Sequence, residues 1–192
     1  AFSQTLGSLG TTAPGVADPE YFAATFEALQ LLVREGGIIA GHDISAGGMI
    51  ITLLEMCFAN REGGLTLNLT EIGESDTVRL LFSQNPGVII QVSDESDTEE
   101  FLCERGIRFA SIGHPIRERK LSVVNGNSHF EFDIDRCRSL WYRSSYLLDR
   151  RQCGTELAKE RFENHGSKAH HFDLKNFTGN FKTLGITPER KA

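Results

Sequence analysis

A glycine-rich turn between a strand-like stretch and a helix-like stretch constrains this chain more than any other feature. The turn covers residues 41–48 and reads GHDISAGG. Before it, residues 37–40 form a short apolar run with β-branched side chains, which is typical of a strand. After it, apolar side chains in residues 49–59 recur at the offsets of one helical face. The pattern predicts a strand that passes directly into a helix.

The residue types in this turn suit a phosphate bound together with a magnesium ion. A helix leaves its first amide N–H groups unpaired, and glycines such as Gly47 and Gly48 let an anion approach that backbone. Asp43 supplies a carboxylate oxygen of the kind that Mg²⁺ prefers, and Ser45 supplies a hydroxyl group that also suits a helix N-cap. The turn predicts half of a magnesium-nucleotide or phosphate site. The same residue types also occur in capped turns that bind no ligand.

The turn and the helix after it resemble the signature of the phosphoribosylformylglycinamidine synthase family. Residues 42–48 read HDISAGG and residues 53–59 read LLEMCFA, which are similar to the family's HDxSDGGL and LLEMAFAG. The resemblance is strong over about residues 1–105 and weaker from there to the end. One position departs from the family, because Ala46 stands where the family has a second acidic residue.

This resemblance implies a place within a large, single-chain, ATP- and glutamine-dependent ligase of purine biosynthesis. That enzyme converts formylglycinamide ribonucleotide to formylglycinamidine ribonucleotide, and the chain resembles the AIR-synthase-like C-terminal domain of its second half. By the same resemblance Asp43 would ligate Mg²⁺, Ser45 would contact ATP or ADP, and Gly47 and Gly48 would face phosphate. The resemblance assigns no catalytic residue to this chain. Ala46 removes one carboxylate from this cluster.

The implied partners are the other domains of the same polypeptide, namely the first half of the synthase and the glutaminase domain, together with nucleotide and the ribonucleotide substrate. The alternative is a non-catalytic module that braces the other half and seats the glutaminase. We expect residues 1–17 to connect from a preceding domain, residues 18–150 to form the domain, and residues 151–192 to form a helix and a linker toward an absent glutaminase domain. Residues 172–179 resemble that linker.

The order of predicted elements indicates an α/β (α+β) fold, a mixed β-sheet with helices packed on one face. Asp18 and Pro19 mark the start of a helix, whose apolar residues we expect in the core. These residues are Phe22, Phe26, Leu29, Leu32 and Val33. We expect strands at 65–69, 88–92 (central in the sheet), 109–113, 121–124 and 129–134, and further helices at 77–83, 96–105, from 133 onward, and 155–164.

The last two helices carry an arginine-rich region, residues 136–161, around the only tryptophan, Trp141. Arginines interleaved with aromatic residues suit a single-strand nucleic-acid platform, but a helix that docks on a neighbouring domain explains them as well and is favoured. The net charge of −6 also disfavours nucleic acid as a partner.

Composition excludes several other classes of protein. No apolar run reaches the length of a membrane span and no signal segment opens the chain, so we expect a cytoplasmic protein with no membrane partner. The four cysteines form no CxxC pair, and His165, His170 and His171 have no acid or cysteine at ligand spacing. We therefore expect neither a zinc site nor a disulfide, with Cys57 and Cys103 on apolar helix faces.

Overall fold

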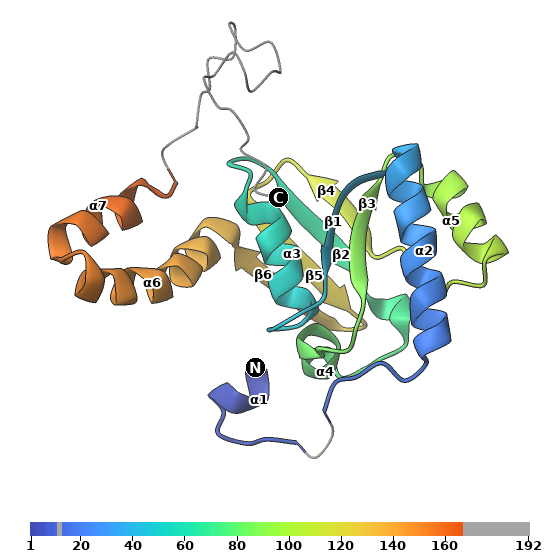
Figure 1. Cartoon of the computed structure of the whole chain (residues 1–192), viewed down its shortest axis with the longest axis horizontal. Helices are drawn as coiled ribbons and strands as arrows, with labels where there is room; N and C mark the ends of the chain where they lie inside the picture. The colour runs from blue at the N-terminus through green and yellow to red at the C-terminus, as the bar shows by residue number, and fades with distance from the viewer. Residues whose placement is uncertain (11–12, 167–192) are drawn as a thin grey trace, which may run out of the picture. The chain divides into compact units, whose positions relative to one another are not determined.

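The computed structural model describes residues 1–10 and 13–166 (Figure 1). The chain divides into two compact units, residues 1–145 and 146–192, and each is considered by itself. The first unit contains the helices α1 (Phe2–Thr5), α2 (Pro19–Glu35), α3 (Met49–Phe58), η1 (Thr70–Ile72), α4 (Thr77–Phe82) and α5 (Glu95–Glu104). Its strands are β1 (Ile38–Asp43), β2 (Gly64–Asn68), β3 (Val88–Val92), β4 (Gly113–Ile116), β5 (Lys120–Asn125) and β6 (Ser128–Asp133). Helix α6 (Ile134–Gln152) starts in the first unit and ends in the second, which also contains α7 (Thr155–Asn164).

The strands form two sheets. The larger is mixed, with strand order β4-β2-β5-β6, in which β2 runs parallel to β5 and the other neighbours are antiparallel. Strands β1 and β3 form a separate antiparallel pair. The predicted mixed sheet with helices is confirmed. The prediction that residues 88–92 are central in it is wrong, because among residues 1–10 and 13–166 the only strand that pairs with β3 is β1. Residues 109–112 form no strand either, since β4 begins at Gly113.

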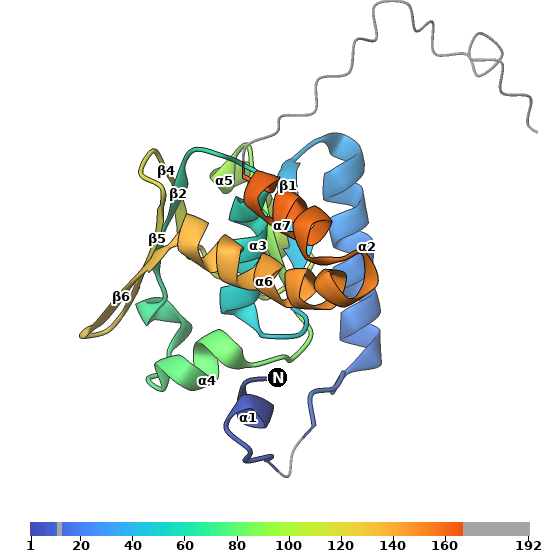
Figure 2. The same cartoon turned by 90° about the vertical axis from the view of Figure 1, so that its left-hand side faces the viewer.

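Helix α3 organises the main core. It lies against one face of the four-stranded sheet, and α2 lies beyond β1 and β3, as Figures 1 and 2 show. Leu53 on α3 is buried together with Leu121 and Val123 on β5. Ile89 of β3 packs against the same cluster and is partly buried there, whereas Val88 of the same strand is exposed. Because α3 is apolar over most of its circumference, it is the buried helix of the domain.

Helix α2 begins as predicted but buries a different face. The Asp18 carboxylate accepts the Tyr21 N–H at 2.9 Å, and Gly36 ends the helix at a φ of 75°. Ala28 and Leu32 are the buried residues of this helix, and they pack in a second cluster with Leu102 and Ile107. Of the five residues expected in the core, Leu32 is buried and Leu29 is half-buried, whereas the other three are 49–56% exposed. These three are Phe22, Phe26 and Val33.

Two arginines hold the C-terminal end of α3. The Nη1 group of Arg119 donates to the carbonyl oxygens of Cys57 and Gly63, both at 3.1 Å. Nη1 of Arg138 donates to the Phe58 carbonyl at 3.2 Å. The Asp135 carboxylate bridges the two guanidinium groups at 3.2 and 2.9 Å. Carbonyls at a helix end lack partners within the helix, so this clamp satisfies them from two distant parts of the chain.

The hairpin of β5 and β6 turns at Gly126, which has a φ of 56°, as the Asn-Gly sequence predicts. In the second unit, the Tyr146 and Phe162 rings stack at 4.9 Å, and Arg161 pairs with Asp149 at 2.8 Å. Helix α7 has the predicted bounds. His170, His171 and residues 172–179 lie outside the described residues.

Candidate functional site

The glycine-rich turn joins β1 to α3, as predicted. Strand β1 ends at Asp43, and the Ile44 N–H donates to the Gly87 carbonyl at 2.8 Å. The Thr52 hydroxyl, in the first turn of α3, donates to the Asp43 carbonyl at 3.1 Å. The strand end is thus tied to the N-terminal turn of the helix, and the side chains of residues 43–45 are held beside it.

Asp43 and Ser45 both lie at the surface. The Asp43 side chain is 74% exposed, and Ser45 and Ala46 are exposed as well. No apolar packing covers the Asp43 carboxylate, whose nearest charged or titratable neighbour is the His42 ring, with Oδ1 3.5 Å from Nδ1. The structure therefore leaves a carboxylate and a hydroxyl open to a ligand at the start of α3.

Gly48 is the N-cap of α3, and no side chain caps the helix. The prediction that Ser45 suits the N-cap is wrong, because Ser45 lies three residues earlier and uses its carbonyl to accept the Gly48 N–H at 3.0 Å. Gly48 has a φ of 76° and is buried, and a Cβ there would lie 2.6–2.7 Å from the backbone of Leu81 and Phe82. A Cβ at Gly47 would meet Ile51 at 2.4 Å. The absence of a side chain at each glycine therefore lets the turn pack closely against α4 and against Ile51 of α3.

Gln84 follows α4 and faces the same turn. With its amide oriented so that both donors are satisfied, the Gln84 oxygen accepts the Gly47 N–H at 3.0 Å and the Ala1 nitrogen at 2.7 Å. Phe2 of α1 stacks on Phe82 with ring centroids 4.2 Å apart. The amides of Gly47 and Gly48 therefore both have partners within the chain, from Gln84 and Ser45 respectively.

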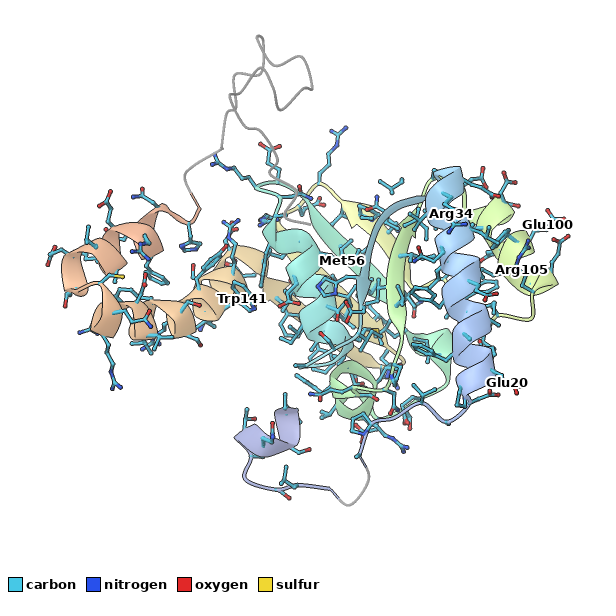
Figure 3. All side chains as sticks on the ribbon, in the orientation of Figure 1. Glu20, Arg34, Met56, Glu100, Arg105 and Trp141 are labelled. Atoms are coloured by element: carbon cyan, nitrogen blue, oxygen red, sulfur yellow. The ribbon has the colours of Figure 1, made fainter. Side chains whose placement is uncertain are left out.

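A polar cluster beside the turn was missed by the sequence reasoning. The Glu55 carboxylate lies 3.4 Å from Nε2 of His42 through Oε2 and accepts the Trp141 indole N–H at 3.1 Å through Oε1. Nδ1 of His42 is 2.8 Å from the Asp43 carbonyl. Trp141 comes from α6, where Figure 3 labels it. The sequence does single out Glu55, because it is the only charged residue within the apolar helix α3.

The side chains of the turn are not enough to enclose a magnesium ion by themselves. Among residues 1–10 and 13–166, no group of three or more histidine, cysteine, aspartate or glutamate side chains is placed to hold a metal. Mg²⁺ is usually held by one or two carboxylates, with substrate phosphates and water completing its octahedron. A single open carboxylate at Asp43 fits that partial role, and the remaining ligands would come from nucleotide, water and other parts of a larger protein.

A hollow of about 620 Å³ lies elsewhere, between β3 and β4. Ile90, His114 and Met56 are among its lining residues, whereas Asp43, Ser45, Gly47 and Gly48 are not. Cys57 also lines it, and burial raises the pKa of that thiol, although Arg119 opposes the rise. All four cysteines are free, with Cys57 buried as predicted but Cys103 exposed, contrary to expectation. The hollow and the turn are separate features of the fold.

The chain matches a known protein family over most of its length. The family described as "AIR synthase related protein, C-terminal domain" matches residues 2–125. The chain belongs to this family. Every helix of this AIR synthase C-terminal domain that lies in the described part of the chain is too short or too polar to span a membrane.

Two curated relatives of this AIR synthase C-terminal domain are named as phosphoribosylformylglycinamidine synthases. The chain is 31% identical over 155 residues to "Probable phosphoribosylformylglycinamidine synthase, chloroplastic/mitochondrial" of Arabidopsis thaliana, covering 79% of this chain and 11% of that protein. It is 31% identical over 168 residues to "Phosphoribosylformylglycinamidine synthase" of Homo sapiens, covering 83% and 12%. The expected family is confirmed, and the chain spans only about one ninth of these relatives.

Solved structures show the same fold. "Structure of PurLQS from Thermotoga maritima" matches with a TM-score of 0.56 at 20% identity and covers 65% of this chain and 22% of that one. "T. maritima PurL complexed with ATP" matches with a TM-score of 0.55 at 19% identity and covers 63% and 22%. A related structure holds ADP.

Proposed function

We propose that the chain is the part of a phosphoribosylformylglycinamidine synthase that completes a magnesium-nucleotide site from one side. The proposal rests mainly on the Asp43 carboxylate, which is exposed to solvent. It lies at the end of β1, where the Thr52 hydroxyl ties the strand to the N-terminal turn of α3. Support comes from two relatives of that name that align with most of this chain, and from Thermotoga maritima structures of the same fold that hold ATP or ADP.

Each residue of the turn has a distinct part in this proposal. Asp43 would hold Mg²⁺, which supplies charge neutralisation for the nucleotide phosphates when bound. The exposed Ser45 hydroxyl would donate a hydrogen bond to the nucleotide. The amide of Gly47, which now faces Gln84, would exchange that oxygen for a phosphate oxygen, and Gly48 keeps the turn closed against α4.

The reaction of the whole polypeptide, as implied by the relatives' name, joins ammonia from glutamine to formylglycinamide ribonucleotide at the expense of ATP. The first half of the synthase and the glutaminase domain would be the partners of this chain. Four free cysteines fit a reducing compartment such as the cytoplasm, which we propose as the location. The Arabidopsis relative, by contrast, is named chloroplastic/mitochondrial.

The second candidate is a non-catalytic bracing module within the same enzyme. It is favoured by the burial of Gly48 and by the partners that Gly47 and Gly48 already have within the chain. In this case the glycines would serve packing alone, and Asp43 would contribute nothing to turnover.

Asp43→Asn in the complete synthase polypeptide separates the two candidates, with Asp97→Asn as the matched control on an exposed helix turn. For a nucleotide site we expect Mg-ADP affinity, measured by calorimetry, to fall about tenfold or more, because a metal ligand is lost. Turnover should fall with it, and the melting temperature should stay within about 2 °C. A lowered melting temperature with turnover per folded molecule preserved would instead establish bracing.

A further inference from the structure

We infer that Glu55 is a positioning residue: it holds the His42 imidazole against the strand end that carries Asp43 and anchors this arrangement to Trp141 of α6. The contacts of Glu55 are seen in the structure, whereas their effect on nucleotide binding rests on the proposed function. No metal ligand is assigned to Glu55. Its action is through His42.

Both carboxylate oxygens of Glu55 are engaged in different directions. Oε2 lies 3.4 Å from Nε2 of His42, and Oε1 accepts from Nε1 of Trp141 at 3.1 Å. The Glu55 side chain is only 26% exposed and that of His42 only 32%. Partial burial of a carboxylate is costly unless its oxygens have partners: the Trp141 N–H supplies a hydrogen bond to Oε1, and the His42 ring supplies an ion-pair partner for Oε2 when it is protonated.

His42 passes this constraint to Asp43. Its Nδ1 lies 2.8 Å from the Asp43 carbonyl oxygen, and since a carbonyl can only accept, Nδ1 carries the hydrogen and donates. In the imidazolium form, which carries a hydrogen on each nitrogen, the ring is held on both sides, by the Glu55 carboxylate at Nε2 and by the Asp43 carbonyl at Nδ1. With Thr52 donating to the same carbonyl at 3.1 Å, two groups fix the peptide from which the Asp43 side chain extends.

Trp141 supplies the anchor on the third side. Its indole ring lies 6.0 Å from the Phe58 ring, at the far end of α3 from the turn, and 5.0 Å from that of Tyr142. The single hydrogen bond that an indole can donate goes to Glu55. Glu55 is 12 residues from Asp43 and 86 from Trp141 in sequence, so one side chain joins three separate elements, β1, α3 and α6.

The first experiment reads the contacts directly in the 192-residue chain. Glu55→Gln keeps the shape and an acceptor for Trp141 but removes the charge that faces His42, and Glu27→Gln is the matched control on an exposed helical position. NMR of the ring resonances, with His42 assigned through His42→Gln, is expected to show a clear shift for His42 in Glu55→Gln and none in Glu27→Gln. Unchanged His42 resonances would overturn the inference.

Trp141→Phe tests the hydrogen bond from Trp141 to Glu55, and it keeps the inference testable if Glu55→Gln fails to fold. The chain has a single tryptophan, so the indole N–H resonance is unambiguous. Loss of this side chain should also move the His42 ring resonances, because Glu55 then keeps only one of its two partners. If they stay in place in a folded Trp141→Phe chain, Glu55 does not link α6 to the turn.

The second experiment measures the consequence for the ligand in the complete synthase polypeptide. Glu55→Gln should weaken Mg-ADP binding about tenfold, as removal of a group that orients a ligand typically does, while Glu27→Gln should not. If Asp43→Asn weakens binding and Glu55→Gln does not, the positioning role is refuted and the proposed function stands. If Asp43→Asn leaves Mg-ADP affinity and turnover unchanged, with or without a change in melting temperature, the proposed function fails, and the His42 resonances still decide whether Glu55 positions that ring.

Discussion

Gly48 shows how much of the turn is decided by one residue. Its φ of 76° and ψ of −168° fall in a region of backbone space that is essentially restricted to glycine. The space that a side chain would need is also filled by the backbone of Leu81 and Phe82. Conformation and packing therefore impose the same choice independently.

We expect Gly48→Ala to destabilise the first unit by about 3 kcal/mol or more, since backbone strain and overpacking add. Gly36→Ala is the matched control, because Gly36 has a similar φ of 75° but no atom within 4 Å of the position that a Cβ would take. It should cost only about 1 kcal/mol, the conformational part. Urea unfolding followed by Trp141 fluorescence measures both, and equal losses in the two variants would show that packing at Gly48 is unimportant.

Sequence reasoning could predict the strand-to-helix turn that carries Asp43 and Ser45. Local rules suffice there, because a β-branched run, a glycine turn and a helical period follow one another within 22 residues, 37–58. It could not find the cluster at Glu55. That contact joins residues 86 apart, and no periodicity reports which side chains meet across such a distance. Glu55 was conspicuous as an acid in an apolar helix, but its partners were not predictable.

At the scale of elements, local sequence signals predict which helices and strands form, but not which face of each one is buried. The bounds of α7 and the turn of the β5–β6 hairpin follow from capping and Asn-Gly chemistry. In α2 the apolar residues form two adjoining stripes, and spacing alone cannot say which one meets the core. The buried stripe contains Ala28 and Leu32, and the exposed one contains Phe22, Phe26 and Val33. Likewise, a β-branched run does not reveal that β3 has one strand neighbour.

Substitution on the two stripes of α2 should therefore have opposite outcomes. Leu32→Ala removes a side chain that is 5% exposed and should cost about 2–4 kcal/mol. Phe26→Ser replaces a side chain that is 56% exposed and should change stability by less than about 1 kcal/mol. Denaturant midpoints of the two variants measure the difference. Comparable losses would mean that Phe26 belongs to the core, as its spacing suggested.

At the scale of the whole molecule, the proposed magnesium-nucleotide site would be only partly contained in this domain. The chain corresponds to 11% and 12% of two relatives, and it offers one open carboxylate where a magnesium ion needs about six ligands. The fold class could be predicted from the order of strand and helix patterns, and the family from the motif at residues 42–59. How a complete magnesium-nucleotide site would be assembled could not be predicted, because one carboxylate does not say which other groups would join it.

We accordingly expect the 192-residue chain alone to bind Mg-ADP weakly or not at all and to have no synthase activity. Calorimetric titration at millimolar nucleotide, with and without excess EDTA, checks the first point. Micromolar affinity that EDTA abolishes would show that the chain carries a full site by itself.

The clamp on α3 bears on how such a chain emerges from a ribosome. The carbonyls of Cys57 and Phe58 receive their hydrogen bonds from arginines 62 and 80 positions later. A nascent chain that ends before Arg119 exposes the finished helix with its last carbonyls open, and the second bond must wait for Arg138. The main core also contains Leu121 and Val123 of β5 and Ile134 of α6, so vectorial synthesis delays its closure until the hairpin and the start of α6 have left the exit tunnel.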